Sequence, residues 1–180
     1  MDEYTEHFIT TFTGKKFHYL NPQPDEIDIR DIAHALSLTC RFGGHVREFY
    51  SVSEHSVRVA LELPKVLRLS GLLHDAHEAY LHDVPRPIKR DMPGYKNMAD
   101  TIQAAINKKF ALISFEKYSI INWADDTLLS TEARDLMTTT QDWTELPPPL
   151  EEEIFPWTAT DAEFSFLDYF NLWRNDGTNS

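Results

Sequence analysis

The segment 66–73 constrains the fold of this chain most. Its residues, VLRLSGLL, are apolar on nearly every side of a helix. A helix of that kind must be buried at the centre of a domain, because no face of it suits water. Pro64 suits the first position of a helix. We therefore expect a central helix over about 65–81, with the rest of the chain packed around it.

Apolar residues recur at helical spacing on both sides of this segment. They predict helices over 28–40, 96–112, 116–140 and 160–173, and one that begins after a cap at Ser51 or Ser53. Alternating apolar and polar residues around Gly14 predict a small β-hairpin over 8–20. The acidic, proline-rich stretch 145–157 predicts a surface loop with partial disorder. The chain is thus expected to be mainly α-helical: one domain over 1–180, with a small N-terminal β-hairpin and a helical core over 28–140.

The bulk properties exclude several classes of protein. The net charge is −12 and no basic stripe is visible, so we do not expect binding to duplex nucleic acid. No apolar run is long enough to cross a membrane, and the acidic start MDEYTEHF does not resemble a signal peptide. Cys40 is the single cysteine, which excludes an intrachain disulfide and favours a cytoplasmic protein.

The dipeptide His-Asp occurs twice, at His74-Asp75 and at His82-Asp83. The first copy lies in the apolar central segment, where ionisable side chains would be buried and would need a partner. A divalent cation is one such partner. The second copy falls where the prolines begin and suits the rim of a pocket. A lone His-Asp pair is a weak motif, and each histidine could instead be an ordinary core or surface residue.

Other segments supply further candidate ligands. His55 lies within an apolar helical pattern and is expected to face inward. Asp125 stands three residues before Leu128, on the buried side of its helix, while Asp126 is rotated about 100° away. Three consecutive helices then contribute the ordered set H…HD…D, namely His55, His74, Asp75 and Asp125. Mixed nitrogen and oxygen ligands suit Mn²⁺, Fe²⁺, Co²⁺, Ni²⁺ or Zn²⁺ better than Ca²⁺.

This ordered set resembles that of the HD-domain phosphohydrolase superfamily. The chain looks most like its short bacterial and phage members, which act on deoxynucleotides. The resemblance runs over about 29–136 and includes DIAHALSLTCRFGGH, YSVSEHSVRVA, LLHDAHEAYLHDVPRPIK and ADDTLLSTEARDL. It implies an HD-domain helical bundle with one catalytic divalent metal bound by the four residues above. It also implies a homo-oligomer, a dimer or a larger ring.

Glu78 lies one helical turn after His74, so both side chains are expected to face one cavity. A carboxylate near a metal-bound water can orient the water or transfer a proton. In the 5′-deoxynucleotidases that this chain resembles, a glutamate three residues after the aspartate does this, so the resemblance makes Glu78 and Asp75 catalytic. It also implies that Asp83 accepts a hydrogen bond from the sugar 3′-hydroxyl.

The resemblance extends to residues that would contact the rest of the substrate. Arg41 resembles an arginine placed beside the phosphate and sugar. Phe42, where related chains often have tryptophan, would crowd the 2′ position. Lys89 would meet phosphate oxygens, and Arg86 is a further candidate cation; the alternative for each cation is a solvated surface charge. His77 is expected to be a structural or surface residue, or to lie behind a metal ligand.

These residues predict a metal-dependent deoxynucleotide phosphohydrolase that cuts the bond between the α-phosphorus and O5′. The substrate would be a triphosphate, as in conversion of dATP to deoxyadenosine and triphosphate with Mg²⁺ accompanying the nucleotide, or a monophosphate. A phosphodiesterase for cyclic or linear nucleotides is an alternative, with His45 and His77 as spare ligands for a second metal. A non-catalytic nucleotide sensor is another, although the complete ligand set argues against it. The sequence leaves open the base and the metal.

Overall fold

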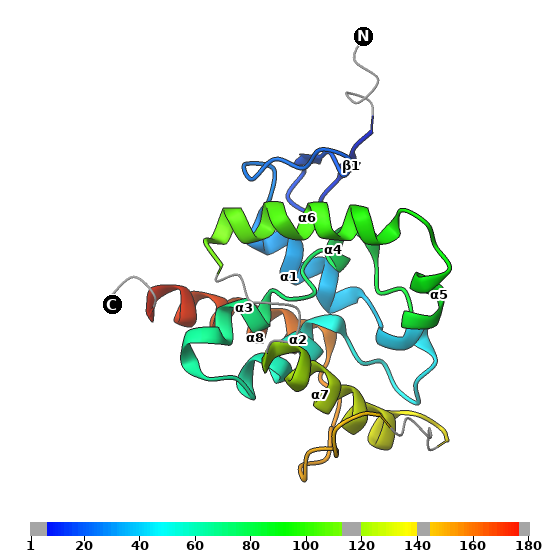
Figure 1. The fold of residues 1–180 in the computed structure, drawn as a ribbon. Coiled ribbons are helices and arrows are strands. Elements are labelled where there is room, and N and C mark those ends of the chain that lie inside the picture. The colour runs from blue at the N-terminus through cyan, green and yellow to red at the C-terminus, as the bar shows by residue number, and fades with distance from the viewer. Residues whose placement is uncertain (1–6, 113–119, 140–144, 177–180) are drawn as a thin grey trace.

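The computed structural model describes residues 7–112, 120–139 and 145–176, and its architecture is mainly helical (Figure 1). The two short strands are β1 (Ile9–Thr10) and β2 (Lys16–Phe17). The α-helices are α1 (Ile29–Leu38), α2 (Val52–Leu61), α3 (Arg68–Leu72), α4 (Glu78–Leu81), α5 (Arg86–Arg90), α6 (Tyr95–Phe110), α7 (Ile120–Leu136) and α8 (Ala159–Asp176). Two 3₁₀ turns, η1 (Arg41–Gly44) and η2 (Lys65–Leu67), complete the regular elements of the residues that the structure describes.

The predicted N-terminal hairpin is confirmed. β1 and β2 pair antiparallel, with Ile9 opposite Phe17, and Gly14 adopts the left-handed φ of +83° that the tight turn requires. Asp31 of α1 accepts hydrogen bonds from the backbone N–H of Thr13 at 2.6 Å and from its hydroxyl at 3.0 Å. A two-stranded hairpin is marginal by itself, and these bonds attach it to the helical body.

The central segment is mostly buried as predicted, although Val66 is 68% exposed. The single helix expected over 65–81 is wrong. The chain forms η2 and α3, passes through a series of tight turns, and resumes as α4. In the turns the His74 ring donates from Nδ1 to the Gly71 carbonyl at 2.7 Å. The backbone bonds there span three residues, as in the 2.9 Å bond from the Glu78 N–H to the Asp75 carbonyl. The side chain competes with the backbone for a helix carbonyl, and the helix breaks at the His-Asp pair.

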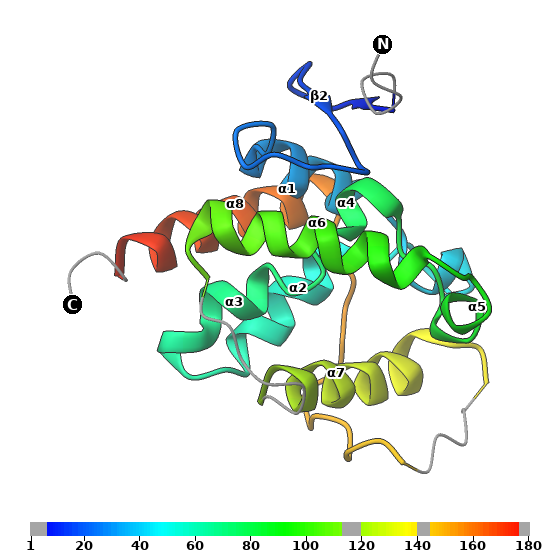
Figure 2. The same ribbon diagram turned by 45° about the horizontal axis from the view of Figure 1, so that its top comes forward.

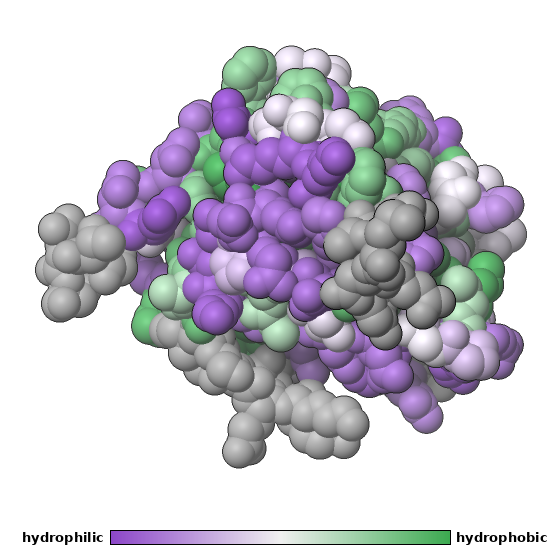
Figure 3. Space-filling view, turned by 90° about the horizontal axis from the view of Figure 1, so that it is seen from above, coloured by the Kyte–Doolittle hydropathy of each residue, from purple (hydrophilic) through white to green (hydrophobic). Residues whose placement is uncertain are grey.

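Most of the helices pack around α2. α1, α3, α7 and α8 all contact it, and Ile32, Val52, Leu72 and Phe166 are fully buried in the main core. In both ribbon views, α2 and α3 lie between α6 and α7, and α5 lies at one edge (Figures 1 and 2). The face seen from above is mostly hydrophilic, with smaller apolar areas between the polar side chains (Figure 3).

The acidic stretch 145–157 is irregular, as expected, but it is bound to α7. Its Leu150 N–H donates to the Thr131 hydroxyl, and its Ile154 N–H donates to the Asp135 carboxylate, each at 2.9 Å. These two bonds attach the segment to the helical body.

The final helix begins earlier and ends later than the predicted 160–173. The Thr158 hydroxyl accepts a hydrogen bond from the Asp161 N–H at its start, so the cap lies two residues before the expected first position. Within the described ranges, none of the helices combines the length and apolar character needed to cross a membrane.

Candidate metal centre

Two buried imidazoles point at one place. His55 lies on α2 and is fully buried, and His74 lies in the turns after α3. Their ring centroids are 5.4 Å apart. The Nε2 atoms of both rings are buried and have no hydrogen-bond partner within the described part of the chain. Buried polar atoms without a partner are uncommon and call for an explanation.

Two carboxylates converge on these nitrogens. Asp125 of α7 brings Oδ1 to 3.1 Å from Nε2 of His55. Asp75 brings Oδ2 to 3.2 Å from Nε2 of His74 and to 3.8 Å from Nε2 of His55. His55, His74 and Asp125 each offer one candidate ligand atom, and these atoms lie within 4.8 Å of one another. The structure thus brings together the four residues predicted from the sequence.

The other nitrogen of each ring is fixed by an acceptor. Nδ1 of His55 lies 2.6 Å from a Glu132 oxygen, and Nδ1 of His74 lies 2.7 Å from the Gly71 carbonyl. Each Nδ1 therefore bears the proton, and in the neutral rings the lone pairs of Nε2 face the carboxylates. Lone pairs and carboxylate oxygens repel each other unless a cation lies between them, so these residues fit a divalent metal.

Protons and a metal compete for the same atoms. Burial and the charge of Arg41 lower the pKa of His55. The carboxylates of Glu132 and Asp125 outweigh both effects and raise this pKa to about 9. Burial raises the pKa of Asp75 and Asp125, but the adjacent imidazoles hold both well below the usual range for aspartate. The cluster therefore favours anionic carboxylates facing a positive charge.

Glu132 is a supporting residue that the sequence reasoning missed. It is fully buried, and its second oxygen accepts from Nε and Nη2 of Arg41 at 3.2 and 2.9 Å. Glu132 stands seven residues after Asp125, which is two helical turns along the same face, and this spacing could have identified it. Arg41, expected beside a phosphate, pairs with Glu132, its Nη1 lies 3.9 Å from Asp75, and it also lines the adjacent pocket.

Glu78 is buried beside the cluster, with 1% of its surface exposed. Lys89 donates to Oε1 at 2.6 Å, while Oε2 has no partner among the described residues. Burial and the charges of Asp75 and Asp83 raise the pKa of Glu78 to about 8, against the opposing charge of Lys89. A carboxyl group with such a pKa can hold or release a proton near neutral pH.

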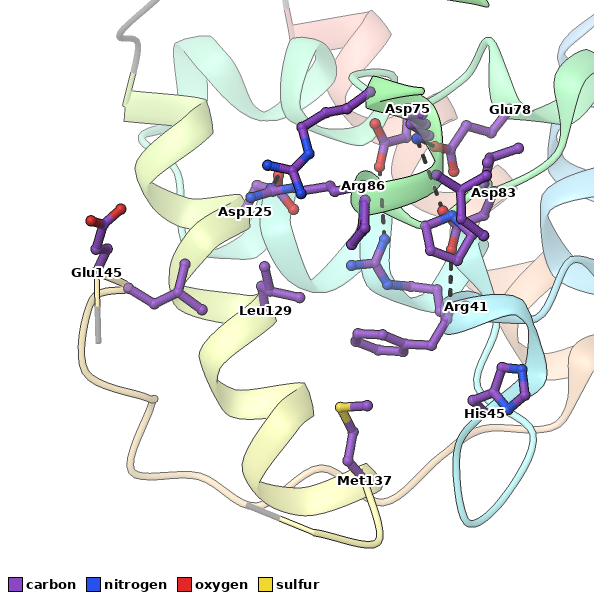
Figure 4. A pocket seen from close by; sticks show the side chains of 18 residues that line it. Arg41, His45, Asp75, Glu78, Asp83, Arg86, Asp125, Leu129, Met137 and Glu145 are labelled. Atoms are coloured by element: carbon purple, nitrogen blue, oxygen red, sulfur yellow. Dashed lines mark hydrogen bonds and ion pairs between the residues drawn. The ribbon is translucent and has the colours of Figure 1, made fainter. Parts of the chain in front are cut away.

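The metal centre lies beside a pocket of about 910 Å³. Figure 4 shows the carboxylates of Asp75, Glu78, Asp83 and Asp125 near one end of it, with Arg86 among them. The remainder is more apolar. Its walls include Phe42, Val84, Pro85, Leu129, Met137 and Leu146. One end of the pocket thus suits a metal and an anion, and the other suits a flat apolar group.

Of the second His-Asp pair, the aspartate faces this pocket. Asp83 lines the pocket, and its Oδ2 accepts from the backbone N–H of Phe42 at 3.2 Å. Oδ1 of Asp83 is 4.0 Å from the ammonium of Lys89. Phe42 has a left-handed φ of 56°, and its ring lies 5.4 Å from the guanidinium carbon of Arg41. His82 is exposed and also has a positive φ, of 64°.

The remaining predicted residues have other partners. Arg86 binds Asp125 at 2.8 Å and Asp126 at 2.9 Å, so Asp126 shares an arginine with the candidate ligand Asp125. His77 contacts the amide oxygen of Gln103 on α6 through Nδ1, at 3.1 Å. Burial lowers the pKa of His77, and the ring belongs to a separate group with Asp75 and Glu78, outside the set of four candidate ligands.

Comparison with known proteins identifies relatives of this chain. No family model matches it. The uncharacterised protein YfdR of Escherichia coli (strain K12) is 44% identical over 129 residues, which cover 72% of this chain and 72% of YfdR. The chain belongs to the same family as YfdR. The uncharacterised protein RCAP_rcc00048 of Rhodobacter capsulatus is 37% identical over 110 residues, 56% of each chain.

Proposed function

We propose that this chain is an HD-domain phosphohydrolase that hydrolyses deoxynucleotides at the bond between the α-phosphorus and O5′. One observation supports it above all. The buried Nε2 atoms of His55 and His74, with no hydrogen-bond partner among the described residues, face two carboxylates at the polar end of a large pocket.

A divalent transition metal at His55, His74, Asp75 and Asp125, when bound, supplies a Lewis acid and a water of lowered pKa. Glu78 is the residue placed to exchange a proton with the attacking water or the leaving oxygen, because it is buried and its Oε2 makes no hydrogen bond to the described residues. Lys89 holds the other oxygen of Glu78 and presents positive charge to the same space. Glu132 orients His55, and Gly71 orients His74 through its carbonyl.

The pocket suits a deoxynucleoside beyond the phosphate. Each carboxylate oxygen can accept two hydrogen bonds, so Asp83 can accept one from the sugar 3′-hydroxyl while it binds the Phe42 N–H. Phe42 lines the same wall, where its ring would crowd a 2′-hydroxyl. Leu129 and Met137 offer an apolar surface to the base. The substrate is a triphosphate, of the dATP type, or a monophosphate, since both are cut at the same bond.

The direct test is a substrate panel. We would incubate the protein, reconstituted with Mn²⁺, Co²⁺ or Zn²⁺, with deoxynucleoside mono- and triphosphates, ribonucleotides and cyclic dinucleotides, and identify products by mass. We expect a deoxynucleoside with phosphate or triphosphate, lost in Asp125→Ala and on chelation. Nucleotide binding without turnover would contradict the proposal and favour a sensor.

The same panel tests a phosphodiesterase. Asp75, His77 and Glu78 place candidate ligand atoms within 4.8 Å of one another, and this second group is the observation that favours a second metal. Cleavage of cyclic dinucleotides alone would establish that alternative in place of the deoxynucleotidase.

A further inference from the structure

A second, smaller hollow lies beside the main pocket. Its volume is about 290 Å³, and its walls are His77, Lys89, Arg90, Tyr95, Lys96, Ala99 and Asp100. Lys89 and Arg90 also line the main pocket. The two spaces therefore share these two cations of α5 as walls.

The walls of the hollow are basic in a chain whose net charge is −12. Lys89 is bound to Glu78 and lies 5.6 Å from the centre of the Tyr95 ring. Lys96 pairs with Asp100, but the side chains are 77% and 62% exposed, and exposed pairs of this kind contribute little and exchange readily. The positive charge of Lys96 is thus available to a ligand.

Arg90 has no carboxylate partner among the described residues, whereas Arg41, Arg86 and Lys89 around the main pocket all have one. An arginine between two hollows with its donors unused is suited to a bidentate contact with phosphate oxygens. The four-residue metal centre has no such free cation, because its adjacent cations neutralise carboxylates.

The hollow begins one side chain away from the metal centre. His77 forms its inner wall, and a ring nitrogen of His77 lies within 4.8 Å of carboxylate oxygens of Asp75 and Glu78. The amide of Gln103 fixes this wall. It donates to the Leu73 carbonyl at 2.8 Å, so its oxygen must face His77, where it accepts from the backbone N–H at 3.3 Å.

We infer that this hollow binds the distal phosphates of a condensed phosphate chain whose first phosphate lies at the metal centre. Arg90 and Lys96 are the binding residues. The inference rests on the proposed function and makes its substrate a nucleoside polyphosphate instead of a monophosphate. The same chemistry would accept the end of a free inorganic polyphosphate.

A binding experiment tests the hollow without turnover. The metal-reconstituted protein is titrated in a calorimeter with orthophosphate, pyrophosphate and tripolyphosphate, and its metal content is measured afterwards to show that the ion stays bound. We expect affinity to rise with chain length. Arg90→Gln should weaken tripolyphosphate binding by about ten- to a hundredfold, the scale of a hydrogen bond to a charged group, and Lys96→Gln should weaken it to a smaller extent.

Lys109→Gln is the matched control. Lys109 is exposed at the far end of α6, and its loss removes the same charge from the same helix as Lys96→Gln. We expect it to change tripolyphosphate affinity less than about twofold, because charges more than a Debye length apart are largely screened. Equal affinity in wild type and Arg90→Gln, or tripolyphosphate binding no tighter than orthophosphate, would overturn the inference.

A nucleotide arm separates this inference from the proposed function. The ratio of kcat/KM for deoxynucleoside triphosphate over monophosphate should fall about ten- to a hundredfold in Arg90→Gln. If Arg90→Gln hydrolyses both nucleotides with an unchanged ratio of kcat/KM, the hollow does not bind the distal phosphates, and the proposed phosphohydrolase function still stands. Tripolyphosphate binding that depends on Arg90, in a protein that hydrolyses none of the nucleotides, would instead establish a site for free polyphosphate and remove the proposed function.

Discussion

The two His-Asp pairs, eight residues apart, have the same side chains and different environments. At His74-Asp75 the tight turns after α3 direct both side chains into the buried cluster. At His82-Asp83 the histidine has φ 64° and ψ 161° and is exposed, while the aspartate lines the pocket. The dipeptide itself therefore has no fixed role: the backbone that presents it decides whether it provides two ligands or one pocket carboxylate.

The largest contrast should come from the two aspartates. Asp75→Asn should abolish metal retention and turnover together, because the amide gives up the negative charge that faces both imidazoles. Asp83→Asn should retain the full metal content of wild type. Metal per chain, measured by elemental analysis after dialysis, checks both. Loss of the metal in Asp83→Asn as well would show that the two aspartates do not have different roles.

A second contrast concerns neighbours on α7. Asp125 and Asp126 both bind Arg86, but only Asp125 is within 3.1 Å of His55. Asp125→Ala should lose the metal, and Asp126→Ala should keep it. Full occupancy in Asp125→Ala would remove this residue from the ligand set.

The next effect separates binding from chemistry at the first pair. Glu78→Ala should keep the metal and lower kcat by about 10²–10⁴-fold, the usual contribution of a positioned acid or base. The measurement is turnover across a pH range, alongside metal content. Near-normal rates at any pH would show that Glu78 takes no part in the reaction.

The second pair should show a smaller effect that depends on the sugar. Asp83→Ala should lower kcat/KM for a deoxynucleotide by about ten- to a hundredfold, or about 1.5–3 kcal/mol. The loss should largely vanish with a 2′,3′-dideoxynucleotide, which has no 3′-hydroxyl. Equal losses on both substrates would contradict a contact between Asp83 and the sugar.

The smallest expected effect is on the stability of the fold, and it concerns the backbone at His82, where the two His-Asp pairs differ. The φ and ψ of His82 suit glycine, and a side chain there is strained. His82→Gly should therefore stabilise the fold by about 1 kcal/mol, measured by denaturant unfolding, with unchanged metal content. His45 has an ordinary φ of −82°, so His45→Gly should instead destabilise slightly. Destabilisation by both variants alike would argue that the turn at His82 is not strained.

The sequence predicted what depends on local periodicity. The 3.6-residue period placed Asp125 on the buried side of α7 and His55 inside α2, and both lie there. The break at His74 was not predicted, because the apolar pattern continues through it while the His74 ring binds the Gly71 carbonyl.

Apart from the His and Asp cluster, contacts between distant segments were not predicted from the sequence. Arg86 and Asp125 are 39 residues apart, and no local pattern links them. The short helix α5 was not among the predicted helices, although it carries a proline in its first turn, where this residue is well suited. The substrate and the reaction remain predictions that rest on the family resemblance and the pocket.

The carboxylate that Glu132 shares between His55 and Arg41 has a consequence for how this site can change over evolutionary time. Removing Arg41 alone would take from the buried Glu132 carboxylate one of its two partners, at a cost of up to about 3–5 kcal/mol. It would at the same time alter the basicity of the His55 imidazole in the candidate metal centre. The three residues are therefore epistatic. Lineages that replace one of them are expected to replace its partners as well, so the three positions should covary.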